Sequence, residues 1–227
     1  MTNTGTRSTS LETIRWLGAV DGVLELIDQT VLPAEVRRIQ LRDAESVWEA
    51  IQSLRVRGAP AIGIAAAYGV VLGMQTAVDC DRDEFLRRLE EVTSRLASSR
   101  PTAVNLSWAL GEMRQAAVIS AAQLNSAELL GLLLQHAKEI HDQDRQMCHQ
   151  IGSHGAQWFL ERGYASLLTH CNAGGLATAE YGTALSVIFT MQDLGKKPRV
   201  FVGETRPLFQ GARLTAWELV SDKSRRL

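Results

Sequence analysis

The feature that most constrains the fold is an uncharged run of apolar and small residues from Ala59 to Met74. Pro60 stands near its start, where a helix tolerates proline because the first-turn N–H groups have no intrahelical partner. The run is too short to span a bilayer comfortably, and its glycines suit close contact with neighbouring helices. It therefore predicts a helix covered on all sides by other elements, without a membrane partner.

Composition sets wider bounds. The chain has 227 residues, 45% of them apolar, enough for one large domain or two modest ones. A net charge of -1 gives no sign of a nucleic-acid or membrane-surface partner. The cysteines Cys80, Cys148 and Cys171 are odd in number and widely spaced, which predicts reduced thiols and a cytoplasmic protein. The polar first ten residues lack the apolar core of a secretion signal.

The chain around the apolar run predicts a small sheet followed by helices. Short apolar runs at 14–17, 23–27 and 36–41, separated by turn signals, predict an antiparallel meander. Helical spacing predicts further helices after the N-cap Asp43, at 83–96, at 104–118 and at 126–160. We expect Gly152 and Gly155 to interrupt the last of these helices.

The pattern changes after residue 163. An apolar strand at 165–171, a tight loop, a helix at 177–194, a strand at 199–203 and a helix at 210–220 follow one another. This order begins a doubly wound parallel sheet, although two strands do not complete one. The predicted fold class is α/β: an N-terminal small antiparallel sheet plus helical domain over 1–125, then a linking helix and an incomplete Rossmann-like parallel α/β domain over 126–227.

Three of the five prolines stand just after an arginine and just before a predicted helix. The stretches are Arg57-Gly58-Ala59-Pro60, Arg100-Pro101 and Arg206-Pro207. A helix N-terminus offers free N–H groups and partial positive charge, and an arginine adds donors that match phosphate oxygens. If these three helix starts converged in the fold, they would form a phosphate pocket. The alternative is that these arginines pair with surface carboxylates.

Cys171 ends the first predicted parallel strand, and ligands of open α/β sheets bind at the carboxyl ends of strands. A thiol near a helix N-terminus can be more thiolate-like than usual. The alternative is that Cys171 is a small buried apolar residue. His170 points to the opposite face of the strand, so it is not the expected partner of the thiol. The loop after Cys171 lacks G-x-G-x-x-G, so no dinucleotide cofactor is predicted.

Four histidines fall in one helical region, at spacings of five, eight and five residues. They are His136, His141, His149 and His154. None of the spacings gives the i, i+4 pair that places two imidazoles on one helix face for zinc. No metal site is therefore predicted, and we expect surface or core roles for these side chains.

Four stretches resemble the family of methylthioribose-1-phosphate isomerases, which also includes the regulatory α, β and δ subunits of the translation factor eIF2B. They are Ser53-Leu54-Arg55-Val56-Arg57-Gly58-Ala59-Pro60-Ala61-Ile62-Gly63, Arg100-Pro101-Thr102-Ala103-Val104-Asn105-Leu106, Thr169-His170-Cys171-Asn172-Ala173-Gly174 and Glu204-Thr205-Arg206-Pro207 with Gln210-Gly211-Ala212-Arg213. The likeness extends from about Thr13 to Val220, and four long motifs in the right order make it specific.

The resemblance implies a function. It implies substrate contacts from Arg57, Gly58, Ala59, Arg100 and Gln210, and a catalytic role for Cys171. The family's enzymes convert 5-methylthioribose 1-phosphate to 5-methylthioribulose 1-phosphate in methionine salvage, without a metal or cofactor. A homodimer is also implied.

The same resemblance implies that the cysteine works with an aspartate in a later Asp-Asn-Met motif, which this sequence does not contain. We therefore expect an N-terminal portion of an isomerase with half of the site and little turnover. One alternative is a non-catalytic interaction protein like the eIF2B subunits, although Cys171 and Gln210 favour the enzymes. Another is a poorly folded fragment whose unfinished sheet has an unpaired edge.

Overall fold

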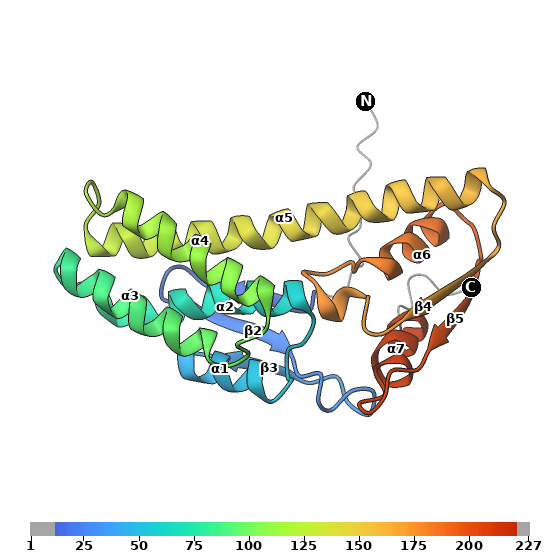
Figure 1. Ribbon diagram of the computed structural model, residues 1–227, viewed down its shortest axis with the longest axis horizontal. Coiled ribbons are helices and arrows are strands. Elements are labelled where there is room, and N and C mark those ends of the chain that lie inside the picture. The colour runs from blue at the N-terminus through green and yellow to red at the C-terminus, as the bar shows by residue number, and fades with distance from the viewer. Residues whose placement is uncertain (1–11, 222–227) are drawn as a thin grey trace.

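The computed structural model describes residues 12–221. Helices α1 to α4 and a three-stranded sheet gather at one end of the molecule, and two parallel strands lie at the other (Figure 1). The long helix α5 (Ser126–Glu161) runs beside both groups. The mixed α/β character predicted from the sequence is confirmed, whereas the Rossmann-like completion of the parallel sheet stays a prediction.

The N-terminal sheet consists of β1 (Ile14–Leu17), β2 (Val23–Ile27) and β3 (Arg38–Leu41) in the order β1-β2-β3. All pairs are antiparallel, with Trp16 opposite Leu24 and Leu24 opposite Leu41. The meander predicted from the sequence is confirmed, although the third strand begins at Arg38 and not at residue 36. Leu24, Leu26 and Ile27 of the central strand are buried, because this strand faces the helices.

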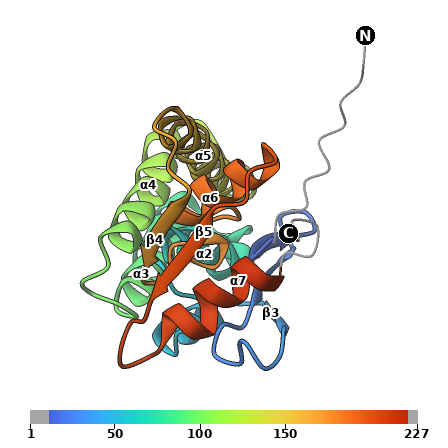
Figure 2. The ribbon, with the colours of Figure 1, turned by 90° about the vertical axis from the view of Figure 1, so that its right-hand side faces the viewer.

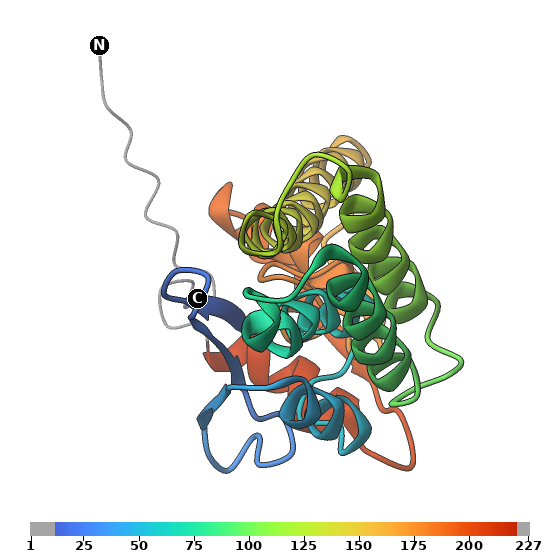
Figure 3. The same cartoon turned by 90° about the vertical axis from the view of Figure 1, so that its left-hand side faces the viewer.

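Helix α2 (Ala59–Met74) is the centre of the helical part. It packs against α1 (Ala44–Gln52), α3 (Arg82–Ala97), α4 (Val104–Ser120) and α5 (Figure 3). The stretch from Ala59 to Ala77 is long and apolar enough to cross a membrane, but 72% of its apolar 18-residue core is buried inside the fold. The predicted buried helix is confirmed. Asp43 caps α1 as predicted, accepting a hydrogen bond from the Ser46 amide at 2.7 Å.

Helix α5 (Ser126–Glu161) continues without a break for 36 residues. The predicted interruption at Gly152 and Gly155 is therefore wrong. A Cβ at Gly152 would lie 2.8 Å from the Ser186 carbonyl oxygen, and one at Gly155 would lie 2.4 Å from the side chain of Val187. These glycines permit close packing against α6 (Ala184–Asp193), an interhelical requirement that the local sequence does not reveal.

The C-terminal part contains a parallel pair, β4 (Ser166–His170) and β5 (Arg199–Gly203), with Leu168 opposite Phe201 (Figure 2). Helix α6 (Ala184–Asp193) connects them. The helix predicted from residue 177 begins at Ala184, because Gly175–Ala177 forms a 3-10 turn and Gly182 has a positive φ of 84°. A π-helical turn, Gly211–Thr215, runs directly into α7 (Ala216–Ser221).

The segment 172–183, called here the Cys171 loop, joins the two parts of the molecule. The Gln29 side chain donates a 2.6 Å hydrogen bond to the Leu176 carbonyl oxygen, and the Asp144 carboxylate accepts one of 2.7 Å from the Ala179 amide. Ile27, Leu32, Leu176 and Leu214 form a small core of their own beneath the loop. The two ends of α5 belong to different cores, and the predicted domain division between 125 and 126 stays a prediction.

Candidate active site

Arg57 is placed by the glycine that follows it. Gly58 precedes α2 with a φ of 99°, a region that residues with a side chain rarely adopt. A Cβ at this position would lie 2.4 Å from the Cα atom of Ala177. Glycine therefore allows the start of α2 at Ala59 to pack directly against the Cys171 loop, and Arg57 lies at that junction.

The guanidinium group of Arg57 is buried without compensation. Arg57 is 7% exposed, and its Nε and Nη1 atoms have no hydrogen-bond partner among residues 12–221. Burial lowers the pKa of Arg57, and the charges of Arg213 and Arg100 lower it further, while Cys171 acts in the opposite direction. These side chains are thus electrostatic neighbours, and an anion among them would supply the missing partner.

Arg100 precedes α4, but not as predicted. Pro101 lies in a turn in which the Ala103 amide donates to the Arg100 carbonyl oxygen, and α4 begins only at Val104. Pro101 therefore lies outside the first helical turn, whereas Pro60 lies within the first turn of α2. The close approach of α4 to α2 brings Arg100 towards the site. The half-buried Arg100 has no ion pair within the described part of the chain.

Cys171 follows the carboxyl end of β4 and is exposed, so the alternative that it is a buried apolar residue is wrong. Its φ of 67° lies in the left-handed region. The next residue, Asn172, has both side-chain amide atoms buried and unpartnered among the residues described. Cys148 is buried and Cys80 is partly buried.

Gln210 follows β5, at the sheet edge where Cys171 follows β4. It is partly buried, and its Oε1 atom has no partner in the described chain. The neighbouring amides of Gly211 and Ala212 donate to the Glu204 carboxylate at 3.1 and 3.3 Å. The third predicted anion-binding helix start is therefore wrong, because Glu204 occupies these amides and because Arg206-Pro207 lies in a turn before the helix.

Sequence reasoning did not select Asn172 or Arg213 as site residues. Both stand inside the recognised motifs, one directly after Cys171 and the other three residues after Gln210. Arg213 also donates to the carbonyl oxygens of Thr30 and Leu32, which ties the loop between β2 and β3 to this edge. Motif membership was the available signal.

Three of the four histidines discussed above, His136, His141 and His149, have structural partners. The buried His141 is 3.1 Å from the Tyr68 hydroxyl group, and burial lowers the pKa of His141 to about 4. His149 lies 3.3 Å from the buried Glu180 carboxylate, and His136 lies 3.4 Å from Glu139. Over residues 12–221, no group of three His, Cys, Asp or Glu side chains is placed to hold a metal ion.

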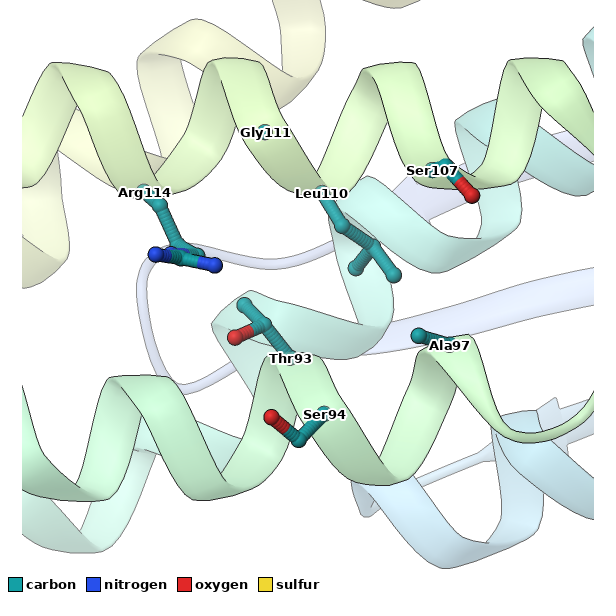
Figure 4. A pocket seen from close by; sticks show the side chains of 7 residues that line it. All are labelled: Thr93, Ser94, Ala97, Ser107, Leu110, Gly111 and Arg114. Carbon is teal, nitrogen blue, oxygen red and sulfur yellow. The ribbon is translucent and has the colours of Figure 1, made fainter. Parts of the chain in front are cut away.

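A groove of about 210 Å³ between α3 and α4 is separate from these residues (Figure 4). Its lining consists of Thr93, Ser94, Ala97, Ser107, Leu110, Gly111 and Arg114. Arg114 pairs with Glu90 at 3.0 Å, so the cation of this groove is already neutralised. The groove contains none of the predicted site residues.

The chain is similar to proteins that are named as sugar-phosphate isomerases. The chain is 52% identical over 199 residues to the 5-deoxyribose 1-phosphate isomerase of Moorella thermoacetica, covering 88% of this chain and 56% of that protein. It is 49% identical over 213 residues to the methylthioribose-1-phosphate isomerase of Citrifermentans bemidjiense, covering 94% and 60%.

Two solved structures share the fold. The eIF-2B delta subunit from A. fulgidus has a TM-score of 0.82 at 40% identity, covering 94% of this chain and 60% of that one. The 5-methylthioribose 1-phosphate isomerase from Pyrococcus horikoshii has a TM-score of 0.84 at 36% identity, covering 93% and 58%. The chain thus spans between 56% and 60% of the length of these relatives.

The fold and site define an α/β protein in which Arg57 lies near Arg100, Arg213 and the exposed thiol of Cys171. The model of the Initiation factor 2 subunit family matches residues 55–223, and the chain belongs to this family. The resemblance to methylthioribose-1-phosphate isomerases and eIF2B subunits, expected from the sequence motifs, is confirmed.

Proposed function

We propose that the protein is an aldose–ketose isomerase that converts 5-methylthioribose 1-phosphate to 5-methylthioribulose 1-phosphate. Arg57, Arg100 and Gln210 bind the sugar phosphate together with the backbone at Gly58 and Ala59. Cys171 is the catalytic residue contributed by the chain described here. The names of the Citrifermentans bemidjiense and Pyrococcus horikoshii proteins support this substrate.

The observation that carries the proposal is the unpaired guanidinium group of Arg57. A buried cation without a carboxylate is costly, and proteins normally neutralise such a group with a partner. Arg55, two residues earlier, has such partners in Asp28 at 2.6 Å and Glu49 at 3.0 Å. The contrast within one loop indicates that Arg57 is reserved for a ligand anion, for which a phosphate group has matching geometry.

The reaction also requires acid/base chemistry. Aldose–ketose isomerisation moves hydrogen from C2 to C1 without net oxidation, so one positioned group removes a proton and another delivers one. The phosphate on C1 blocks simple opening to a free aldehyde, which makes positioning and exclusion of water important. The thiol of Cys171 supplies one such group. We propose that its partner is the aspartate of the family's Asp-Asn-Met motif, absent from these 227 residues.

The test is to mix the chain with 5-methylthioribose 1-phosphate and to measure binding by calorimetry and conversion by NMR. We expect saturable binding and turnover lowered by about 10² to 10⁴ relative to a full-length enzyme, because one acid/base partner is missing. R114M is the matched control, because Arg114 is paired with Glu90 in the separate groove. Absence of sugar-phosphate binding by the folded chain would count against the proposal. So would an equal loss of binding in R100M, which alters the proposed site, and in the control R114M.

A second candidate function is a non-catalytic subunit of a translation-factor assembly. The similarity to the eIF-2B delta subunit supports it. Purification of the chain in a stable guanine-exchange assembly, together with failure to bind the sugar phosphate, would favour this alternative.

The proposal includes a homodimer in the cytoplasm, as the resemblance implies. Light scattering on the purified protein tests the oligomeric state, and a monomer at micromolar concentration would contradict that part. A Rossmann-like completion of the parallel sheet is also part of the proposal. A structure of the protein with its family-length C-terminal region would test it.

A further inference from the structure

Two buried side chains lie beneath the Cys171 loop on one face of the helical segment 211–221. Thr215 and Glu218 are three residues apart, a spacing that places side chains on the same side of a helix. Thr215 is 0% exposed and Glu218 is 6% exposed. Both are polar, so each needs a reason to be buried here.

Thr215 holds the backbone of the reactive residue itself. Its hydroxyl group donates a 2.5 Å hydrogen bond to the carbonyl oxygen of Cys171. Cys171 has a φ of 67°, a conformation that costs free energy for a residue with a side chain. A hydrogen bond to its carbonyl oxygen fixes that conformation and therefore the direction in which the thiol leaves the chain.

Glu218 contacts the Cys171 loop further along the chain, at Leu176. Its Oε2 atom accepts a hydrogen bond from the Leu176 amide at 3.3 Å. A Cβ at Gly174 would lie 2.3 Å from Oε1, so the carboxyl group packs directly on the loop backbone. Within the described chain, Oε1 has no partner.

The burial of this carboxyl group is unfavourable when it is ionised. Burial raises the pKa of Glu218 to about 8, and the amides of Leu176 and Gly175 oppose that shift. The protein thus retains a group whose ionisation is costly, in contact with the loop that carries Cys171. An apolar side chain would fill the same space without this cost but would leave the amides unpaired.

Resting on the proposed function, we propose that Thr215 and Glu218 are positioning residues that together clamp the backbone from Cys171 to Leu176 and so hold the thiol beside the arginines. Other distant side chains hold the loop further along: Thr13 bonds the Gly175 carbonyl oxygen, Gln29 bonds Leu176 and Asp144 bonds Ala179. Thr215 is the described side chain that bonds the Cys171 backbone.

The charge preference of Cys171 alkylation measures where the thiol lies. Iodoacetate is anionic and iodoacetamide is neutral, so nearby arginines accelerate the first reagent relative to the second. The rate of each reaction is followed by mass spectrometry of the peptide that contains Cys171, which separates it from Cys80 and Cys148. For the wild-type chain we expect an iodoacetate-to-iodoacetamide ratio at least about threefold above that of the same chain unfolded in urea, because local positive charge concentrates anions.

The variants separate positioning from general stability. T215V removes one hydroxyl group while keeping the side-chain shape, and E218L removes the acceptor; both should reduce the ratio towards the unfolded value. E218Q keeps an acceptor oxygen and should preserve it. E180Q is the matched control, because Glu180 is a buried carboxylate of the same loop that pairs with Arg145 and His149 instead.

The outcomes distinguish this inference from the proposed function. A raised ratio in the wild-type chain that persists in folded T215V and E218L overturns the clamp alone. An equal fall in E180Q also overturns it, because any loosening of the loop would then suffice. No anion preference in the wild-type chain overturns the arginine pocket and the clamp with it. Thermal melts confirm that each variant is folded, and T215V tests the clamp if E218L does not fold.

Discussion

Arg55 and Arg57 lie two residues apart in one loop, and only Arg55 has carboxylate partners within residues 12–221. Asp28, the buried partner of Arg55, has a pKa below its ordinary value, because hydrogen bonds from Thr30 and Arg55 outweigh the effect of burial. One arginine therefore stabilises the fold through its carboxylate partners, and the other, buried without a partner, makes the fold less stable.

This contrast predicts opposite effects of two similar substitutions. R57M should abolish sugar-phosphate binding and raise the free energy of unfolding by about 1 kcal/mol, because it removes a buried unpaired charge. R55M should leave binding intact and lower the free energy of unfolding by about 2 kcal/mol, because Asp28 loses its cation. Urea denaturation and calorimetry measure both effects. Equal losses of binding in the two variants would contradict the division of roles.

The glycines of α5 give a second prediction. G155A should lower the free energy of unfolding by about 1–3 kcal/mol, because the new Cβ would overlap the side chain of Val187. G131A is the control on the same helix. Nothing lies within 4 Å of its Cβ position, so alanine there should stabilise the protein by about 0.5–1 kcal/mol. Denaturation curves with the same sign for both would refute the packing argument.

Substitution of Gly58 separates the cost of a close approach to Ala177 from the cost of backbone strain. G58A should destabilise the protein more than G163A, because both positions have positive φ but only Gly58 has a neighbour within 4 Å, at 2.4 Å. Strain alone costs about 1–2 kcal/mol for a side chain in the left-handed region. G58A should also weaken sugar-phosphate binding by displacing Arg57. Comparable melting temperatures for the two variants would show that the approach to Ala177 is unimportant.

The buried Glu218 predicts that stability falls as pH rises. Its folded pKa is about 8 against an ordinary 4.5, so the folded chain retains a proton that the unfolded chain has released in that interval. The contribution is fully present below pH 4.5 and is lost as pH rises through 8. Below pH 6.5, His141 opposes it, because its folded pKa of about 4 makes protonation favour the unfolded chain.

The effect of Glu218 is therefore best measured between pH 6.5 and 8, where His141 does not oppose it. The wild-type chain should lose about 2 kcal/mol of unfolding free energy across this interval, and E218Q should lose much less. Denaturation at several pH values, with E180Q as the control, checks this. An unchanged slope in E218Q would assign the loss to other groups.

Periodicity and turn signals were sufficient to predict the three-stranded meander, the buried α2 and the parallel pair. They failed where a long-range contact decides the conformation. Gly152 and Gly155 look like helix breakers until α6 is placed against them, and the residues after Ala177 look helical until the Cys171 loop is held by distant side chains.

The site was predictable in part. Motif resemblance selected Arg57, Arg100, Cys171 and Gln210, and electrostatics links the first three in the structure, while their functional roles remain proposals. Burial, which distinguishes Arg57 from Arg55, is a tertiary property. The same is true of Thr215, whose hydroxyl group matters only because Cys171 lies above it.

The bonds between Thr13 or Gln29 and the Cys171 loop join residues at least 147 positions apart in the chain. During synthesis, at 5–20 residues per second, the first strands leave the ribosome roughly 10 s before these partners exist. The nascent meander must therefore either persist without its bonds to the Cys171 loop, or form its strand pairs only late in synthesis. The attachment of the meander to the rest of the molecule thus rests on long-range contacts, which form late because the intervening chain must first be made.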